Sequence, residues 1–93
     1  MHLIDVTNSY ASLVHSQLNS TDVNYVKVYS LGNTSVIYTE SNNAIGIVLE
    51  NHSRRVRREE FEFVIKRLVK ENDPSYQITI DKNQHVLEIH VNK

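Results

Sequence analysis

The sequence predicts an α/β (α+β) fold, in which a mixed or largely antiparallel sheet of about six strands packs with two helices. The expected order of elements is β-α-β-β-β-α-β-β. Two segments, 10–18 and 61–69, repeat apolar residues at the 3.6-residue spacing of a helix. The other segments are rich in β-branched and aromatic residues or alternate apolar with polar residues, which is typical of strands. Short turn sequences join several of these strands and favour hairpins.

The first two elements are a short strand at residues 3–6 and the helix that follows it. The helix is predicted by an apolar stripe at spacing i, i+3, i+4, i+7 and i+8, formed by Tyr10, Leu13, Val14, Gln17 and Leu18. Asn8 or Ser9 is the expected N-cap, because either side chain can accept a hydrogen bond from a free backbone N–H. The polar residues 19–22 then end the helix in a loop.

Three strands are expected in the middle of the chain, at residues 25–29, 35–39 and 44–49. Residues 31–34 should join the first two as a hairpin, because Gly32 can take a positive φ at the first turn position. Residues 44–49 are apolar at odd and even positions alike, so this strand should be central and covered on both faces. The cover would come from a helix on each side, or from a partner subunit on one side in a homo-oligomer formed through the sheet.

The second helix and a terminal hairpin complete the expected fold. The helical stripe consists of Phe61, Val64, Ile65, Leu68 and Val69. The segment 72–75 should stop this helix, because proline and the residue before it disfavour helical backbone. Two alternating runs, 76–81 and 86–91, are joined by residues 82–84 and predict a hairpin.

The composition indicates one folded domain that spans residues 1–93, with 40% hydrophobic and 23% charged residues. The chain has no cysteine, which excludes disulfides, thiolate zinc sites and iron–sulfur clusters. Its five histidines are scattered, so we expect no metal and no cofactor. We find no export signal and no apolar run of membrane-spanning length, so we expect a cytoplasmic protein.

Three stretches of the chain follow a pattern that other proteins share, namely residues 3–9, residues 26–30 with 32–34, and residues 54–56 leading into 60–65. In these stretches the chain resembles small proteins of lactic-acid bacteria that are grouped as domain-of-unknown-function family 1827. The resemblance covers roughly residues 3–70 and leaves the terminal hairpin unmatched. The resemblance implies a single-domain intracellular bacterial protein with a compact α/β fold. It implies no activity, because the family has none assigned.

The strongest local signal is a group of four arginines within five residues. The four are Arg54, Arg55, Arg57 and Arg58. Only one other cationic residue, Lys27, precedes them, and the net charge of the chain is −1. The group is therefore a local electropositive site, and arginine forks suit phosphate or carboxylate partners better than they suit burial.

The expected start of the second helix decides how these arginines would point. If Ser53 is the N-cap, residues 54–58 form the first turn and a half of the helix. Three of the arginines would then share one face, and Arg55 would point away. Because the positive end of the helix dipole lies there, either Glu59 and Glu60 offset the charge or the field holds an anion.

Two interpretations of the arginine group remain open. In the first, the arginines contact an acidic protein surface, and the protein is a non-enzymatic binding or accessory module. In the second, they are a solvated helix start in which Arg55–Glu59 and Arg58–Glu62 form i,i+4 pairs worth about 0.3–0.5 kcal/mol each.

Two further functional classes are compatible with the sequence. A weak nucleic-acid-binding module would use the same arginines together with tyrosines on neighbouring strands, namely Tyr25, Tyr29 and Tyr38. A pI of about 6.5 and the lack of a known nucleic-acid-binding motif count against it. A small-ligand enzyme would need a concave pocket near residues 7–9 that contains a carboxylate or histidine with a shifted pKa. Separately, Asn8 and Ser9 could contact a small anion at the helix start. No residue is assigned a catalytic role.

Overall fold

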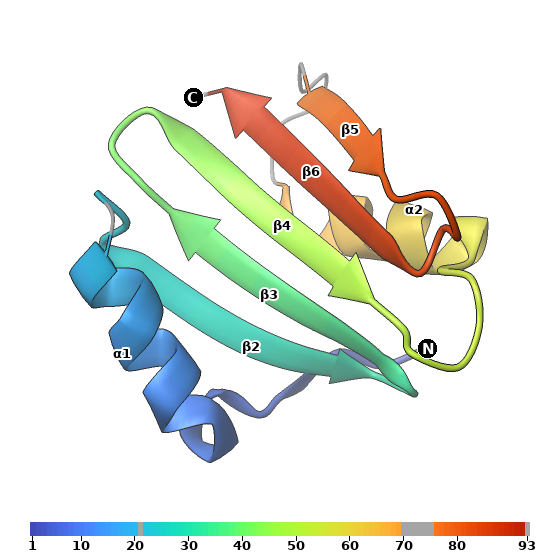
Figure 1. The fold of residues 1–93 in the computed structure, drawn as a ribbon, viewed down its shortest axis with the longest axis horizontal. Coiled ribbons are helices and arrows are strands. Elements are labelled where there is room, and N and C mark those ends of the chain that lie inside the picture. The colour runs from blue at the N-terminus through green and yellow to red at the C-terminus, as the bar shows by residue number, and fades with distance from the viewer. Residues whose placement is uncertain (21, 70–75, 93) are drawn as a thin grey trace.

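The computed structural model describes residues 1–20, 22–69 and 76–92, and in these ranges the chain forms one six-stranded sheet with two α-helices (Figure 1). The strands are β1 (Ile4–Asp5), β2 (Tyr25–Leu31), β3 (Thr34–Glu40), β4 (Ala44–Glu50), β5 (Tyr76–Ile80) and β6 (Val86–Asn92). The helices are α1 (Ala11–Ser20), which follows a 3₁₀ turn at Thr7–Tyr10, and α2 (Arg58–Leu68). The predicted order of elements is confirmed.

All neighbouring strands of the sheet are antiparallel, in the order β1-β2-β3-β4-β6-β5. The strand predicted at residues 44–49 is central, because β4 pairs with β3 on one side and with β6 on the other. The terminal hairpin is also confirmed, with β6 inside the sheet and β5 at its edge. Helix α2 connects β4 to this hairpin and lies behind β6 and β5 (Figure 1).

The main core lies between the sheet and α2. The cross-strand partners Tyr38, Ile47 and Ile89 share the face that α2 covers, and Val64 of α2 packs with them. Burial of this apolar surface supplies the main driving force for folding. The buried cluster consists of Leu31, Val36, Tyr38, Ile47, Leu49, Val64, Val69, Ile89 and Val91.

The opposite face of the sheet is covered less completely. Helix α1 contacts β2, and its Gln17 shares a shallow concavity with Thr39 and Val48 on that face. The two helices therefore lie on opposite faces. Further along the same face β6 presents the exposed residues Glu88 and His90. The expectation of apolar cover on both sides of β4 is thus met fully by α2 and only in part by α1.

The start of α1 differs from the prediction. Neither Asn8 nor Ser9 is the N-cap, because the 3₁₀ turn already begins at Thr7 and has no side-chain cap. Instead the Asp5 carboxylate accepts hydrogen bonds from the backbone N–H and the hydroxyl of Thr7, at 2.9 and 2.6 Å. The Thr7 hydroxyl in turn accepts the N–H of Val28 at 3.0 Å and so fixes this turn to β2.

Three other predictions can be compared with the structure. Gly32 has a φ of 59°, which confirms the positive φ expected in the β2–β3 hairpin. The predicted helix stop at residues 72–75 lies outside the described residues. In the part of the chain that the structure describes, no helix is long and apolar enough to cross a membrane.

Candidate functional site

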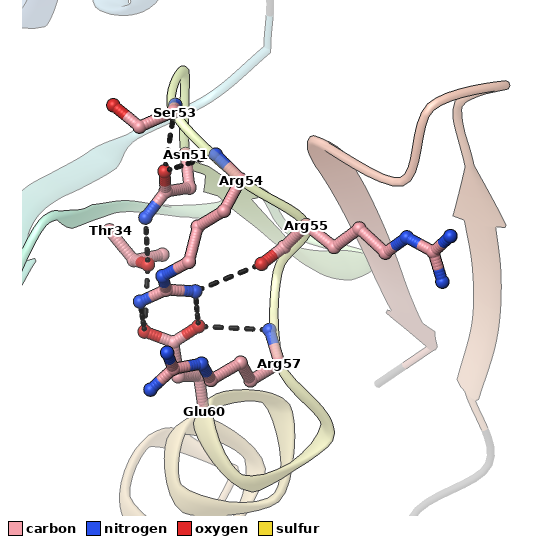
Figure 2. Close-up of polar contacts among 7 residues, drawn as sticks. All are labelled: Thr34, Asn51, Ser53, Arg54, Arg55, Arg57 and Glu60. Carbon is pink, nitrogen blue, oxygen red and sulfur yellow. Dashed lines mark hydrogen bonds and ion pairs between the residues drawn. The ribbon is translucent and has the colours of Figure 1, made fainter.

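The arginine group lies in a loop and not in the first turn of α2. The N-cap residue of α2 is Arg57, with extended backbone (φ −82°, ψ 149°), and not the predicted Ser53. The buried side chain of Asn51 explains this, because its Oδ1 accepts the N–H groups of Ser53 and Arg54 at 2.9 and 3.1 Å (Figure 2). Such a side-chain turn competes with helix formation, so the helix begins later.

The loop is also fixed to the rest of the fold at two backbone positions. The N–H of Asn51 donates to the carbonyl of His85 at 2.9 Å, and the N–H of Val56 donates to the carbonyl of Gln84 at 2.8 Å. Both acceptors belong to the turn between β5 and β6. The segment that carries the arginines is therefore held between the terminal hairpin and α2.

Arg54 and Glu60 form a two-point ion pair inside this loop. Nη1 and Nη2 of Arg54 donate to Oε1 and Oε2 of Glu60 at 2.9 and 3.0 Å (Figure 2). The same carboxylate accepts the Thr34 hydroxyl at 2.8 Å and the backbone N–H of Arg57 at 2.9 Å. Asn51 completes the network by donating its amide N–H to the Thr34 hydroxyl at 3.1 Å.

This network determines the charge state of Glu60, whose side chain is only 6% exposed. Burial by itself raises the pKa of a carboxyl group, because it disfavours the charged form. The hydrogen bonds from Arg54, from the Arg57 N–H and from Thr34 outweigh burial and lower the pKa of Glu60 to about 2. Glu60 is therefore an anion at neutral pH, and Arg54 neutralises it.

The other three arginines remain on the surface. Arg55 points away from Glu60 in Figure 2, and Arg57 is exposed. Arg58 forms the predicted i,i+4 pair with Glu62 at 3.0 Å, but both side chains are largely exposed. The predicted Arg55–Glu59 pair is absent among the described residues, because Arg55 lies outside the helix.

Hollows border the arginine segment in the part of the chain that the structure describes. One of about 620 Å³ lies between the N-terminal residues and the start of α2, and Arg57, Ile4 and Leu31 line it. A second, of about 280 Å³, has Arg57 and Arg58 on its wall. Arg55 lines a third, of about 310 Å³, beside the turn between β5 and β6. Each exposed arginine therefore borders a concave surface that a partner could enter.

The tyrosines considered for base stacking do not form an open platform. Tyr25, Tyr29 and Tyr38 share one face of the sheet, but Tyr38 belongs to the buried core. Its ring meets that of Tyr25 edge-on, with 6.1 Å between ring centroids. Burial, together with the negative charge of Glu40, raises the pKa of Tyr38 to about 12.

The other two kinds of site considered from the sequence are an anion contact at the start of α1 and a metal centre. Asn8 and Ser9 are exposed in the 3₁₀ turn, and an anion contact there remains a prediction. In residues 1–20, 22–69 and 76–92, no three histidine or acidic side chains gather in a way that could hold a metal ion.

The residues that the sequence interpretation missed are Thr34, Asn51 and Glu60. From the sequence, Glu60 is expected only to offset the positive charge at the start of the helix. It is the third residue after the N-cap, where glutamate commonly reaches back to the N-cap N–H, as it does here to Arg57. This role of Glu60 can be recognised in the sequence only if the N-cap of the helix is known to be Arg57.

The comparisons with known proteins identify the family. The family described as "Domain of unknown function (DUF1827)" matches residues 1–92. The chain belongs to this family. The match includes the terminal hairpin, which the sequence resemblance over residues 3–70 had left out.

A solved structure of another protein agrees with this fold. The crystal structure of a conserved protein of unknown function from Streptococcus thermophilus is 28% identical in sequence, with a TM-score of 0.86. The alignment covers 100% of the present chain and 97% of the other. No curated protein matches the chain. The solved structure thus supports the fold, and neither its description nor that of the DUF1827 family names an activity.

Proposed function

We propose that this DUF1827 protein is a non-enzymatic binding or accessory module that contacts an acidic protein surface through Arg55, Arg57 and Arg58. One observation carries the proposal. Of the four arginines, only Arg54 uses its side chain to bind the Glu60 carboxylate, and the hydrogen bonds around Glu60 also fix the loop that carries the other three. The sequence pattern places Arg54 among the contact residues, but we assign it a structural role, because its guanidinium is paired with Glu60 inside the loop.

Two physical arguments support a carboxylate-bearing partner. A fixed loop loses little conformational entropy on binding, so more of the contact energy remains as affinity. Arginine presents a planar fork of N–H donors that fits a carboxylate at two points, and it loses its hydration more readily than lysine does. Arg55 and Arg57 are exposed, and among the described residues no ion pair involves either side chain.

The test is a charge reversal with a matched control. The variant Arg55→Glu/Arg57→Glu removes the two unpaired arginines and leaves the Arg58–Glu62 pair intact. The control Lys66→Glu/Arg67→Glu changes the net charge equally in the last turn of the same helix. Tagged wild type and both variants are used to capture partners from a lysate of the source cell, with and without nuclease.

We expect wild type and the control variant to capture the same protein, with or without nuclease, and Arg55→Glu/Arg57→Glu to lose it. The melting temperatures of wild type and Arg55→Glu/Arg57→Glu should agree within about 4 °C, because exposed charges contribute little to stability. The control variant loses the contact of Arg67 with the Phe63 ring, at 4.9 Å from the ring centroid, and needs only to remain folded. Capture that survives the reversal of Arg55 and Arg57 would refute the proposal, as would capture that nuclease abolishes.

A further inference from the structure

The edge strand β5 is unusually apolar and open for its position. Tyr76, Ile78 and Ile80 alternate on the face of the sheet that α2 covers, yet Ile78 is 40% exposed and Ile80 is 52% exposed. Residues 76–80 contain no charged residue and no proline. Natural edge strands usually carry such residues, because an unprotected edge pairs readily with another strand.

The register also shows which backbone groups of β5 face outward. Ile80 is paired with Leu87, and the N–H of the next residue, Asp81, donates to the carbonyl of Val86 at 3.1 Å. Hydrogen-bonded and non-hydrogen-bonded pairs alternate along an antiparallel ladder. The N–H and C=O groups of Ile78 and Ile80 therefore point away from β6. They lie at the free edge, since no described strand pairs with β5 on that side.

An apolar groove with a basic rim runs beside this edge. Its volume is about 280 Å³, and Phe61, Ile78, Ile80 and Leu87 form its apolar wall. Arg57 and Arg58 lie at the end nearest the start of α2. Further along the strand, the ring of Tyr76 meets that of Phe61 at 6.1 Å between centroids. The free backbone edge of β5, the apolar groove and the positive charge of the arginines thus lie next to one another.

We propose that this edge and groove bind an extended segment of a partner protein, which pairs with β5 as an additional strand. Its inward-facing side chains are apolar and enter the groove, and at least one acidic side chain reaches Arg57 or Arg58. In strand addition, backbone hydrogen bonds supply affinity and alternate side chains supply specificity.

Charge selects this partner over a second copy of the chain. Residues 76–80 carry no acidic group with which a second β5 could complement the arginines, whereas an acidic segment pairs with them directly. The inference rests on the proposed function for its charged contacts, and it narrows the acidic protein surface to an extended strand.

The first experiment selects peptides from a displayed library of random sequences about ten residues long, with the intact protein as bait. We expect the enriched peptides to alternate apolar with polar residues and to contain an acidic residue. The best binder is then synthesised with a fluorescent label, and its affinity for wild type and variants is measured by anisotropy.

Two matched pairs of variants test the geometry. Ile78→Glu places a charge in the groove, whereas Thr79→Glu places the same charge on the opposite face of the same strand. We expect the first to weaken peptide binding at least about tenfold and the second to leave it unchanged.

Ile78→Pro and Ile78→Ala both remove the isoleucine side chain, but only Ile78→Pro removes the outward N–H. We expect the Ile78→Pro variant to bind the peptide at least about tenfold more weakly than the Ile78→Ala variant, with both variants folded as judged by circular dichroism.

The outcomes separate this inference from the proposed function. If no peptide is enriched over an Ile78→Glu bait, or if Ile78→Glu and Thr79→Glu act equally, the strand-addition site is wrong. Dimerisation that Ile78→Glu abolishes, without any peptide binding, would assign the edge to a second copy and also overturn the inference. Partner capture that is lost on reversal of Arg55 and Arg57 but kept by Ile78→Glu would overturn only the inference. Peptide binding that is unchanged in Arg57→Glu/Arg58→Glu would overturn the acidic contact in this inference, whereas partner capture with Arg55→Glu/Arg57→Glu tests the proposed function separately.

Discussion

Arg54 differs from the neighbouring arginines because its guanidinium meets a carboxylate that has almost no contact with water. Removing one partner of such a pair leaves the other charge buried and uncompensated. We expect Arg54→Ala to lower the free energy of unfolding markedly, because the Glu60 carboxylate is left buried without its guanidinium. The matched change Arg55→Ala should alter it by less than about 0.5 kcal/mol. Urea denaturation followed by circular dichroism measures both, and equal effects would contradict the structural role of Arg54.

Acid titration gives a second prediction at the same residue. Folding lowers the pKa of Glu60 from 4.5 to about 2, so the unfolded chain binds this proton more readily. The contribution of Glu60 to stability is therefore complete above about pH 4.5 and is lost as the pH falls towards 2. The difference in unfolding free energy between wild type and Glu60→Gln should narrow by about 3 kcal/mol across this range.

The comparison with Glu60→Gln is needed because Glu60 is not the only carboxyl group that titrates in this range. Hydrogen bonds from the hydroxyl and N–H of Thr7, with one from Lys27, lower the pKa of Asp5 to about 2. Asp5 is present in both proteins, so its effect cancels in the difference. A difference that stays constant from pH 7 to pH 2 would show that the pKa of Glu60 is not lowered.

Among the elements, the β2–β3 hairpin offers a test of backbone conformation alone. Gly32 has a φ of 59°, and a Cβ built there would meet no atom within 4 Å. Any cost of Gly32→Ala is therefore conformational and should be about 1 kcal/mol. Gly32→Asn should cost less, because asparagine tolerates positive φ. Thermal unfolding of both variants measures the order, and a larger loss for asparagine would contradict this explanation.

At the scale of the elements, some sequence patterns were sufficient to predict a helix or a strand and others were not. The stripes in α1 and α2 and the alternation in β5 and β6 predicted those elements correctly, because the periods of 3.6 and 2 residues follow directly from helix and strand geometry. The start of α2 was wrong because Ser53 resembles an N-cap in sequence. The Asn51 side chain accepts the N–H groups of Ser53 and Arg54, and the N–H of Val56, which a Ser53 cap could have used, donates to the carbonyl of Gln84. Neither contact is visible in a hydrophobic pattern.

Sequence also located the candidate site without resolving its parts. Four clustered arginines were visible as a charge signal, but the internal role of Arg54 depends on Thr34, which lies 26 residues from Glu60 along the chain. A contact over that distance exists only when β3, the loop and α2 are already assembled. Local spacing therefore could not separate Arg54 from Arg55.

At the scale of the whole molecule, strand order decides which surfaces are available to partners. The chain leaves β4 through α2, forms β5 at the edge, and returns to place β6 beside β4. The alternation of residues does not specify whether β5 or β6 pairs with β4, because each strand has apolar residues at every second position. The placement of β5 at the edge brings its isoleucines beside Arg57 and Arg58 and so creates the basic-rimmed groove.

The overall charge distribution provides the last prediction, which concerns nucleic acid. The three exposed arginines of the group, Arg55, Arg57 and Arg58, give a small positive surface on a chain of net charge −1, and the exposed Glu59 and Glu62 lie next to it. Nucleic-acid affinity comes largely from many phosphate contacts and falls steeply with salt. We therefore expect no binding to single-stranded or duplex DNA tighter than about 10⁻⁵ M at physiological salt, measured by anisotropy with labelled oligonucleotides of arbitrary sequence. Tighter binding, with log K falling by about 2 to 3 per decade of salt and lost in Arg55→Glu/Arg57→Glu, would reassign the exposed arginines to phosphate contacts.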